Sequence, residues 1–445
     1  MKAGFISLGC AKNLVDTEIM LGILQDHGIE LTTNPADADI LIVNTCAFIQ
    51  SAKEESITTL LSMADYKETG RCRALIVAGC LGQRYGQELL DELPEADAII
   101  GTGAWNRIME AVDETIRGRR VIITEGEIIY DAKMPRIRTT PPYTAYVKIA
   151  EGCDNRCAFC AIPMIRGRYI SRTVEDICAE VHALVGQGVK EINLIAQDTT
   201  NYGHDLYGKP SLARLLKEIV REPKLKWVRI LYCYPRFFTD ELIETIAAEP
   251  KICNYVDLPL QHAHDAVLKR MRRPDTRAEI EALLERIRKG IPGVAIRSTF
   301  IVGYPGETEE EFETLKNFLL EQRFDHVGIF TYSREEDTPA YDLPDQVSEE
   351  VMQERYHELM SINSMISQQK NEELRGRELE ALVVARDEDV PNIVAGRSYR
   401  EAPEVDGLVY IEGDDGSEIG DMMRVRVVDG FVDDVAAERI DEGEA

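Results

Sequence analysis

Three cysteines near the middle of the chain constrain its fold and chemistry more than any other feature. Cys153, Cys157 and Cys160 have the spacing CxxxCxxC and follow an apolar run, residues 144–150, that is typical of a buried β-strand. Three thiolates on one short loop can hold three irons of a cubic iron–sulfur cluster and leave the fourth iron open to another ligand. Gly152 gives the backbone room to turn into such a loop. The spacing therefore predicts a [4Fe–4S] cluster with one free coordination position.

A structural zinc site is the alternative for the same loop. Zinc needs a fourth Cys or His at short range, usually in a second paired motif. At short range downstream of the loop, the chain offers only Cys178 and His182, which are isolated and lie on a predicted helix. The iron–sulfur interpretation is therefore favoured.

The composition is that of a globular protein with more than one domain. The 445 residues exceed what one ordinary core supports, and 44% of them are hydrophobic and 29% charged. The chain has no run of eighteen apolar residues, and its first residues lack the pattern of a signal peptide. We therefore expect a cytoplasmic protein without membrane attachment, whose ten cysteines are reduced thiols or metal ligands.

The chain is strongly acidic, with 79 acidic and 51 basic residues and a formal net charge of −28. Such a charge repels the phosphates of nucleic acids and attracts basic proteins. Solubility alone is the simpler explanation for an acidic excess, so the charge by itself does not identify a partner.

Apolar runs alternate with amphipathic stretches in the first 130 residues, which predicts an open parallel α/β sheet. The expected strands are residues 3–8, 38–43, 74–78 and 97–100, and the expected helices are 14–26, 51–66, 85–93 and 105–117. Cys10, Cys46 and Cys80 follow the first three strands, beyond the carboxyl ends where ligands of such sheets bind. Free cysteines are often simply buried, but three at successive strand ends indicate a second metal centre.

Residues 131–142 contain prolines and arginines without periodicity, and we interpret them as a linker. The expected strands beyond it are 144–150, 191–196, 227–232, 255–260, 295–302 and 326–332. The expected helices are 174–186, 212–221, 240–248, 263–271, 277–289 and 309–321, with a long bracing helix at 348–374. Six β/α units predict a partial, open-sided TIM-type barrel whose active residues lie at the C-terminal strand ends.

The last segment, residues 375–445, predicts a small antiparallel β-barrel, because short β-type runs alternate with Gly/Asp turns. The expected strands are 379–385, 407–411, 423–428 and 431–439. From residue 376 there are seven arginines and no lysine against twenty acidic residues, a net charge of −13. We expect a partner-contact loop that includes Glu401, Glu404 and Asp406, and a disordered terminus that includes Asp441, Glu442 and Glu444.

Two separate three-cysteine sets followed by a small β-barrel resemble the methylthiotransferase family of radical S-adenosylmethionine (SAM) enzymes, over essentially the whole chain. The resemblance implies a methylthiotransferase domain (1–130), a linker (131–142), a radical SAM core (143–374) and a TRAM domain (375–445). It also implies two [4Fe–4S] clusters. The auxiliary cluster is assigned to Cys10, Cys46 and Cys80, and the SAM-cleaving, catalytic cluster to Cys153, Cys157 and Cys160.

The resemblance further implies how these clusters are used. The open iron binds SAM, and reductive cleavage of SAM yields a 5′-deoxyadenosyl radical that can attack an unactivated C–H bond. A second SAM methylates a sulfur on the auxiliary cluster, which must then face the barrel mouth. The electron comes from a donor such as flavodoxin or ferredoxin. We assign SAM contacts to Gln197, Asp198, Arg297, Ser298, Gly303 and Tyr332.

Two branches of the family differ in substrate: one modifies adenosine in tRNA and the other an aspartate of ribosomal protein uS12. Residues 160–167, 196–203 and 399–407 resemble the second branch. The acidic C-terminal segment agrees, since it would repel RNA and attract a Lys/Arg-rich ribosomal protein. We therefore expect methylthiolation of the aspartate β-carbon in uS12 without direct tRNA binding. A tRNA methylthiotransferase and a non-catalytic iron–sulfur module are the alternatives.

Overall fold

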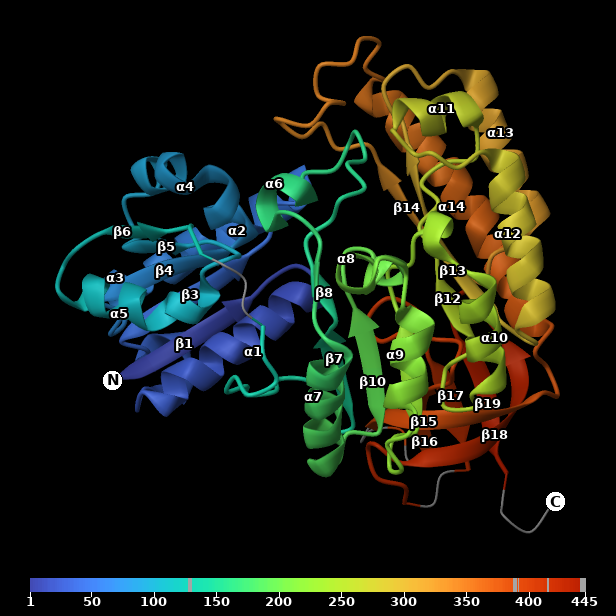
Figure 1. The fold of residues 1–445 in the computed structure, drawn as a ribbon, viewed down its shortest axis with the longest axis horizontal. Coiled ribbons are helices and arrows are strands. Elements are labelled where there is room, and N and C mark those ends of the chain that lie inside the picture. The colour runs from blue at the N-terminus through green and yellow to red at the C-terminus, as the bar shows by residue number, and fades with distance from the viewer. Residues whose placement is uncertain (127–129, 387–389, 391, 414–415, 441–445) are drawn as a thin grey trace.

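The computed structural model describes residues 1–126, 130–386, 390, 392–413 and 416–440. An N-terminal α/β domain lies beside a central barrel, and a small C-terminal barrel lies at one end of the central one (Figure 1). No helix within the described ranges is long and apolar enough to cross a membrane.

The N-terminal domain is a six-stranded parallel sheet with the strand order β2-β1-β3-β4-β5-β6. Its strands are β1 (Lys2–Ser7), β2 (Glu30–Thr32), β3 (Ile40–Thr45), β4 (Ala74–Gly79), β5 (Ala98–Ile100) and β6 (Val121–Ile123). Its helices are α1 (Ala11–Asp26), α2 (Gln50–Ala64), α3 (Tyr66–Thr69), α4 (Cys80–Glu92) and α5 (Ile108–Ile116), with short 3₁₀ turns at Pro35–Asp37 and Trp105–Arg107. The parallel sheet is confirmed, and the unexpected β2 and β6 are short edge strands with little periodic signal.

Both faces of this sheet are covered by helices, because alternate residues of each strand point to opposite faces. Ile40 and Ile42 share an apolar cluster with α1 and α5, whereas Leu41 and Val43 share one with α2 and α4. The first cluster continues into the central barrel through Tyr146. Helix α1 therefore lies at the boundary between the two domains, as Figure 1 shows.

The central domain contains the six expected β/α units as two three-stranded parallel sheets, β7-β10-β11 and β12-β13-β14. Its main strands are β7 (Thr144–Lys148), β10 (Glu191–Ile195), β11 (Trp227–Ile230), β12 (Tyr255–Asp257), β13 (Ala295–Val302) and β14 (His326–Thr331), and a short antiparallel pair comprises β8 (Ala150–Glu151) and β9 (Ile170–Ser171). The bridge Val228–Ile252 joins the two sheets between β11 and β12. The result is a half-open barrel.

Helices surround the barrel and extend from it to the C-terminal domain. They are α6 (Ile162–Arg166), α7 (Val174–Gly186), α8 (His204–Tyr207), α9 (Leu212–Ile219), α10 (Asp240–Ala248), α11 (Asp265–Arg270), α12 (Arg277–Gly290), α13 (Glu309–Gln322) and α14 (Glu349–Glu372), with 3₁₀ turns at Thr199–Asn201 and Pro235–Phe237. The 24-residue α14 packs on β14 and α13 and also contacts β18 of the C-terminal barrel. It therefore braces the central barrel as expected.

The C-terminal domain is a closed five-stranded barrel with the order β15-β16-β17-β19-β18. Its strands are β15 (Glu378–Arg386), β16 (Ile393–Arg397), β17 (Val409–Glu412), β18 (Met422–Gly430) and β19 (Val435–Arg439). The expected all-antiparallel arrangement is wrong at one pair, since β17 and β19 run parallel with Val409 opposite Val435. The strands β17 and β19 run in the same direction because β18, which lies between them in the sequence, runs in the opposite direction.

Residues 397–408, here called the docking segment, attach this barrel to the first residues of the central strands. Arg397 pairs with Glu191 at 2.6 Å, and the fully buried Arg229 donates to the carbonyl oxygens of Ser398 and Tyr399. The segment therefore closes the end of the central barrel that lies opposite the cluster loop.

The expectation of an exposed contact loop in this segment is wrong. Glu401 is buried and accepts hydrogen bonds from Ser398, and buried Asp406 accepts one from the Tyr255 hydroxyl at 2.6 Å. Among the three acids of the expected loop, Glu404 alone is exposed. The terminus 441–445, expected to be disordered, lies outside the described residues.

Candidate functional site

The three cysteines of the barrel lie on a loop that directly follows β8. Gly152 opens this loop with φ +75°, and a Cβ there would lie 2.0 Å from the carbonyl oxygen of Arg168, so the position requires glycine. The Cys153 amide donates to the Gly167 carbonyl at 3.2 Å, and the Cys160 amide donates to the Cys157 carbonyl at 3.1 Å. The backbone thus gathers three thiols at the C-terminal end of the first barrel strand.

The three N-terminal cysteines lie at the carboxyl ends of three adjacent strands. Cys10 is the N-cap of α1 after β1, Cys46 follows β3, and Cys80 begins α4 after β4. A Cβ on Gly9 would lie 2.8 Å from Cβ and 3.1 Å from Sγ of Cys46, so the small residue lets these loops approach each other. The Asn13 side chain ties the loops together by donating to the carbonyl of Thr45 at 2.8 Å.

The pKa of Cys10 is shifted in the opposite direction from those of Cys46, Cys80, Cys153 and Cys160. Burial raises the pKa of Cys10, but the positive charges of Lys12 and Arg166 oppose burial and hold the pKa below its usual range. Burial raises the pKa of Cys80 and of Cys153 to about 12. Metal binding displaces these protons, because the thiolate is the ligand form.

A buried charged network joins the N-terminal domain to the barrel. Arg166, on α6 just after the cluster loop, pairs with Asp16 of α1 at 3.1 Å and with Glu151 of β8 at 2.9 Å. Lys148 of β7 also binds both carboxylates. Burial raises the pKa of Glu151, but Arg166 and Lys148 outweigh it and hold that pKa at about 2. Arg166 Nη2 further lies 3.9 Å from Cys80 Sγ, so one side chain connects the two cysteine regions.

Lys12 occupies the same boundary and was not anticipated from the sequence. It is 5% exposed, and its Nζ lies 3.0 Å from the ring centroid of Tyr232, which follows β11 at the barrel mouth. Burial lowers the pKa of Lys12 to about 8. Lys12 and Asp16 lie one helical turn apart on α1, directly after a candidate ligand cysteine, and this spacing was the available signal.

Four of the six expected SAM-contact residues lie just beyond the C-terminal ends of barrel strands, the side of the barrel that carries the cluster loop. Asp198 accepts a hydrogen bond from Asn155 of that loop at 2.8 Å, and Gln197 donates to Glu151 at 3.1 Å. Gly303 has φ +74° and follows β13, and Tyr332 shares an apolar cluster with Ala158 of the loop. Buried Gln197 Oε1 and Tyr332 Oη have no hydrogen-bond partner among the described residues. Such polar atoms suit a bound polar ligand.

Arg297 and Ser298 are not brought to this group. The Arg297 guanidinium faces the docking segment and pairs with Asp406 at 3.2 Å and with Asp257 at 3.5 Å. The buried Ser298 hydroxyl donates to the Leu258 carbonyl at 2.9 Å. Both lie in the first half of β13, far from its C-terminal end, so we leave them out of the proposed SAM contacts.

The donor chemistry of both cysteine sets fits [4Fe–4S] clusters. Across the described ranges, no three His, Cys, Asp or Glu side chains are close enough to share a single metal ion. A cubic cluster places each thiolate on a different iron, so it does not need the close spacing of a one-ion site. Burial and the neighbouring thiols of Cys157 and Cys153 raise the pKa of Cys160, which agrees with three sulfurs gathered near one another.

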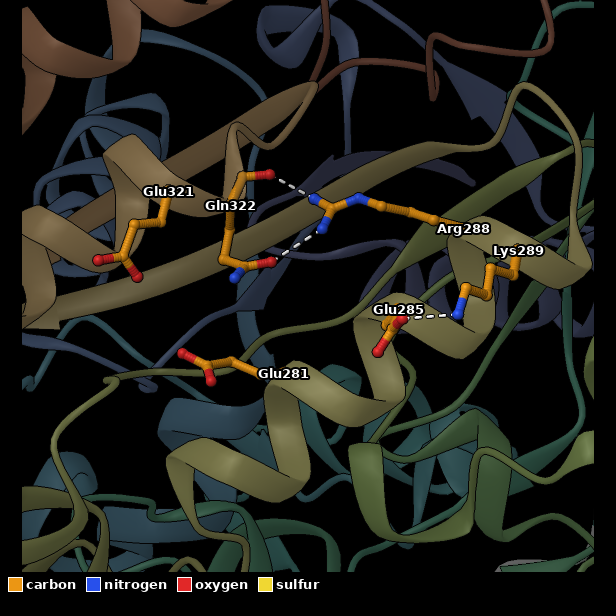
Figure 2. A pocket seen from close by; sticks show the side chains of 6 residues that line it. All are labelled: Glu281, Glu285, Arg288, Lys289, Glu321 and Gln322. Atoms are coloured by element: carbon orange, nitrogen blue, oxygen red, sulfur yellow. Dashed lines mark hydrogen bonds and ion pairs between the residues drawn. The ribbon is translucent and has the colours of Figure 1, made fainter.

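A surface hollow away from the cysteines is not a candidate functional site, because its charged side chains already have partners. A hollow of about 470 Å³ lies between α12 and α13, and Figure 2 shows the side chains that line it. Its lining consists of Glu281, Glu285, Arg288, Lys289, Glu321 and Gln322. Arg288 binds Gln322 and Lys289 binds Glu285, so its cations are paired on the outer helical layer. A hollow of about 380 Å³ beside the buried network, by contrast, is lined by Lys148, Glu151 and Arg172.

Comparison with known families places each part of the chain. Residues 2–101 match the "Uncharacterized protein family UPF0004", residues 147–319 the radical SAM superfamily and residues 376–440 the TRAM domain. Among solved structures, the radical SAM methyltransferase TsrM from Kitasatospora setae superposes with a TM-score of 0.57 over 76% of each chain at 15% identity. That likeness supports the fold.

Curated relatives match nearly the full length. The ribosomal protein uS12 methylthiotransferase RimO of Heliobacterium modesticaldum is 53% identical over 99% of this chain and 96% of the relative. RimO of Geobacter sulfurreducens is 48% identical over 99% and 98%. The chain therefore belongs to the RimO family of radical SAM methylthiotransferases, enzymes that use SAM and [4Fe–4S] clusters.

Proposed function

We propose that this protein transfers a methylthio group to the β-carbon of an aspartate in ribosomal protein uS12. The observation that carries the proposal is identity of about half over the whole chain with curated uS12 methylthiotransferases. The structure supports it by placing the N-terminal cysteine loops against the barrel mouth, where the cluster loop begins. Transfer between two centres requires such proximity.

The residues of this chain hold, orient and shield the reacting groups in this proposal. When bound, the two clusters supply the electron, the radical chemistry and the sulfur carrier. Cys153, Cys157 and Cys160 would hold one cluster, and Cys10, Cys46 and Cys80 the other. Gln197, Asp198, Gly303 and Tyr332 would contact SAM. The buried network of Arg166, Asp16 and Glu151 fixes the two domains relative to each other.

Several accompanying assignments belong to the same proposal. The chain is divided into domains 1–130, 143–374 and 375–445, with 131–142 as a linker that packs against α1 through Arg136 and Glu18 at 2.6 Å. A small electron-transfer protein such as flavodoxin or ferredoxin supplies the electron. The enzyme acts in the cytoplasm, where ribosomal proteins are made, and does not bind tRNA directly, because its charge of −28 repels phosphate.

Mass spectrometry of a deletion strain tests the substrate. We expect uS12 to lose the mass of one methylthio group and tRNA to keep all its modifications. The wild-type gene should restore the mass, whereas a gene carrying Cys153→Ala should not. Loss of methylthio groups from tRNA with unchanged uS12 would assign the chain to the tRNA branch. Unchanged masses in both polymers would contradict the transferase proposal.

A further inference from the structure

We propose that Lys12 forms the subsite that receives the carboxylate of the substrate aspartate. The proposal rests on the function proposed above and extends it, since it names the residue that selects an acidic side chain. An aspartate carboxylate is bonded directly to the β-carbon. A cation that holds the carboxylate therefore also orients the C–H bond that must react.

The position of Lys12 is the first argument. It is the second residue of α1, two residues after Cys10, and its ammonium lies against the ring of Tyr232 from the barrel. The group thus points to the place where the N-terminal cysteine region meets the barrel mouth. A substrate side chain must enter this place to reach both centres.

The second argument is that Lys12 differs from the other cations of this boundary. Lys148 and Arg166 each bind Asp16 and Glu151. Among the described residues, the Lys12 ammonium makes no ion pair with a carboxylate and no hydrogen bond; it lies against the Tyr232 ring and interacts with the charge of Cys10. Nearby Asp257 pairs with Arg297 at 3.5 Å.

Burying an ammonium that has no carboxylate partner is energetically unfavourable, and a cation–π contact offsets only about 2 kcal/mol of that cost. The anion beside Lys12 is the Cys10 thiolate, which the proposal assigns to a cluster. The site therefore favours an incoming carboxylate. The adenine base and asparagine, which carry no negative charge, would gain a hydrogen bond at most and no ion pair.

Backbone features add to the positive potential. The first turn of the 16-residue α1 contains no acidic residue, so its dipole favours an anion, and the backbone N–H groups of Lys12 and Asn13 are directed at the Cys10 sulfur. Tyr232 has φ 61°, a conformation that is rare and costly for a bulky residue. In this conformation the Tyr232 ring lies against the Lys12 ammonium.

A double-mutant cycle tests the subsite with binding as the readout. The reconstituted enzyme is titrated with uS12 and with uS12 in which the modified Asp is replaced by Asn. We expect this replacement to weaken binding to the wild type by about tenfold, which is typical of one close charge pair. Lys12→Met should bind both forms equally weakly, and Lys12→Arg should recover part of the discrimination.

Iron content and a control variant separate the alternatives. Lys12→Met should keep the wild-type iron content, whereas loss of iron would show that Lys12 serves the auxiliary cluster and would overturn the subsite. Lys224→Met, at an exposed lysine before β11, should bind uS12 as the wild type does. If the wild-type enzyme binds uS12 with Asp and uS12 with Asn equally well, the subsite proposal is overturned, whatever the enzyme variants show. If the wild type does not methylthiolate uS12, the proposed function itself is refuted. If it does, but the double-mutant cycle shows no coupling between Lys12 and the substrate Asp, only the role of Lys12 is refuted.

Discussion

At the scale of single residues, the two cysteine sets have different neighbours and are expected to have different tasks. Arg166 and Lys12 bring positive charge to the N-terminal set and lower the pKa of Cys10. The barrel set is surrounded by SAM-contact candidates with unpaired polar atoms, such as Tyr332 Oη. We propose, as the family resemblance implies, that the barrel set serves SAM cleavage and the N-terminal set sulfur transfer.

Removing one cysteine from each set tests this division. Cys153→Ala should abolish formation of 5′-deoxyadenosine, because no spare thiol lies on the cluster loop. Cys80→Ala should stop methylthiolation and still release some 5′-deoxyadenosine, measured by chromatography. Loss of 5′-deoxyadenosine in a well-folded Cys80→Ala protein would contradict the division.

A glycine substitution in the cluster loop should act on both folding and iron binding. At Gly152, φ is +75° and a Cβ would meet the Arg168 carbonyl at 2.0 Å. Gly152→Ala should cost at least about 1 kcal/mol in free energy of unfolding and reduce bound iron to about four atoms per chain.

Gly186→Ala is the matched control, because nothing lies within 4 Å of the added Cβ at the end of α7. It should leave iron content unchanged and raise stability by up to about 1 kcal/mol. Full iron loading of Gly152→Ala would show that the loop tolerates a different backbone path.

At the scale of elements, the docking segment connects two barrels through buried ion pairs. Glu191 of β10 accepts from Arg397 at 2.6 Å and lies 3.4 Å from Arg229. Burial raises the pKa of Glu191, but Arg397 and Arg229 outweigh it and lower that pKa to about 2. The carboxylate is therefore charged at neutral pH and balances two buried guanidinium groups.

Glu191→Gln should lower the free energy of unfolding by about 3–5 kcal/mol at pH 7, since it leaves buried arginines without their anion. Because folding lowers the pKa of Glu191, its contribution is complete above about pH 4.5 and is lost as the pH falls toward 2. Denaturant melts should thus show a difference in free energy of unfolding between wild type and variant, and this difference should become smaller below pH 4.5. The exposed control Glu244→Gln should change stability by less than about 0.5 kcal/mol. A gap that does not vary with pH would contradict this assignment.

At the scale of the whole molecule, acidic charge is distributed over all three parts of the chain, with a net charge of −28. The docking segment buries Glu401 and Asp406, so these acids cannot recruit a partner. Attraction of a basic ribosomal protein is therefore expected to come from the summed field of the molecule rather than from that loop.

The association rate with uS12 should fall as ionic strength rises past about 0.15 M, where the Debye length is about 8 Å. The dissociation rate should change much less, because long-range attraction acts mainly on encounter. Stopped-flow measurements at several salt concentrations check both rates. An association rate independent of salt would show that charge does not steer this partner.

The sequence by itself determined the features that depend on local spacing. The CxxxCxxC loop, the three cysteines after successive strands, the six β/α units and the final small barrel follow from short patterns of apolar, glycine and cysteine residues. These patterns are reliable because strand alternation, helix periodicity and loop glycines act between near neighbours. The short edge strand β2 and the five-residue β16 lacked such a pattern and were not predicted.

Only the tertiary structure decided which distant residues meet. Arg166 reaches Asp16 across 150 positions, Lys12 faces Tyr232, and Arg297 turns to Asp406 instead of the cluster loop. The parallel pairing of β17 with β19 and the burial of Glu401 likewise depend on how domains pack. Such contacts join segments that have no periodic relation in the sequence, because they arise from the burial of surface between elements that fold separately.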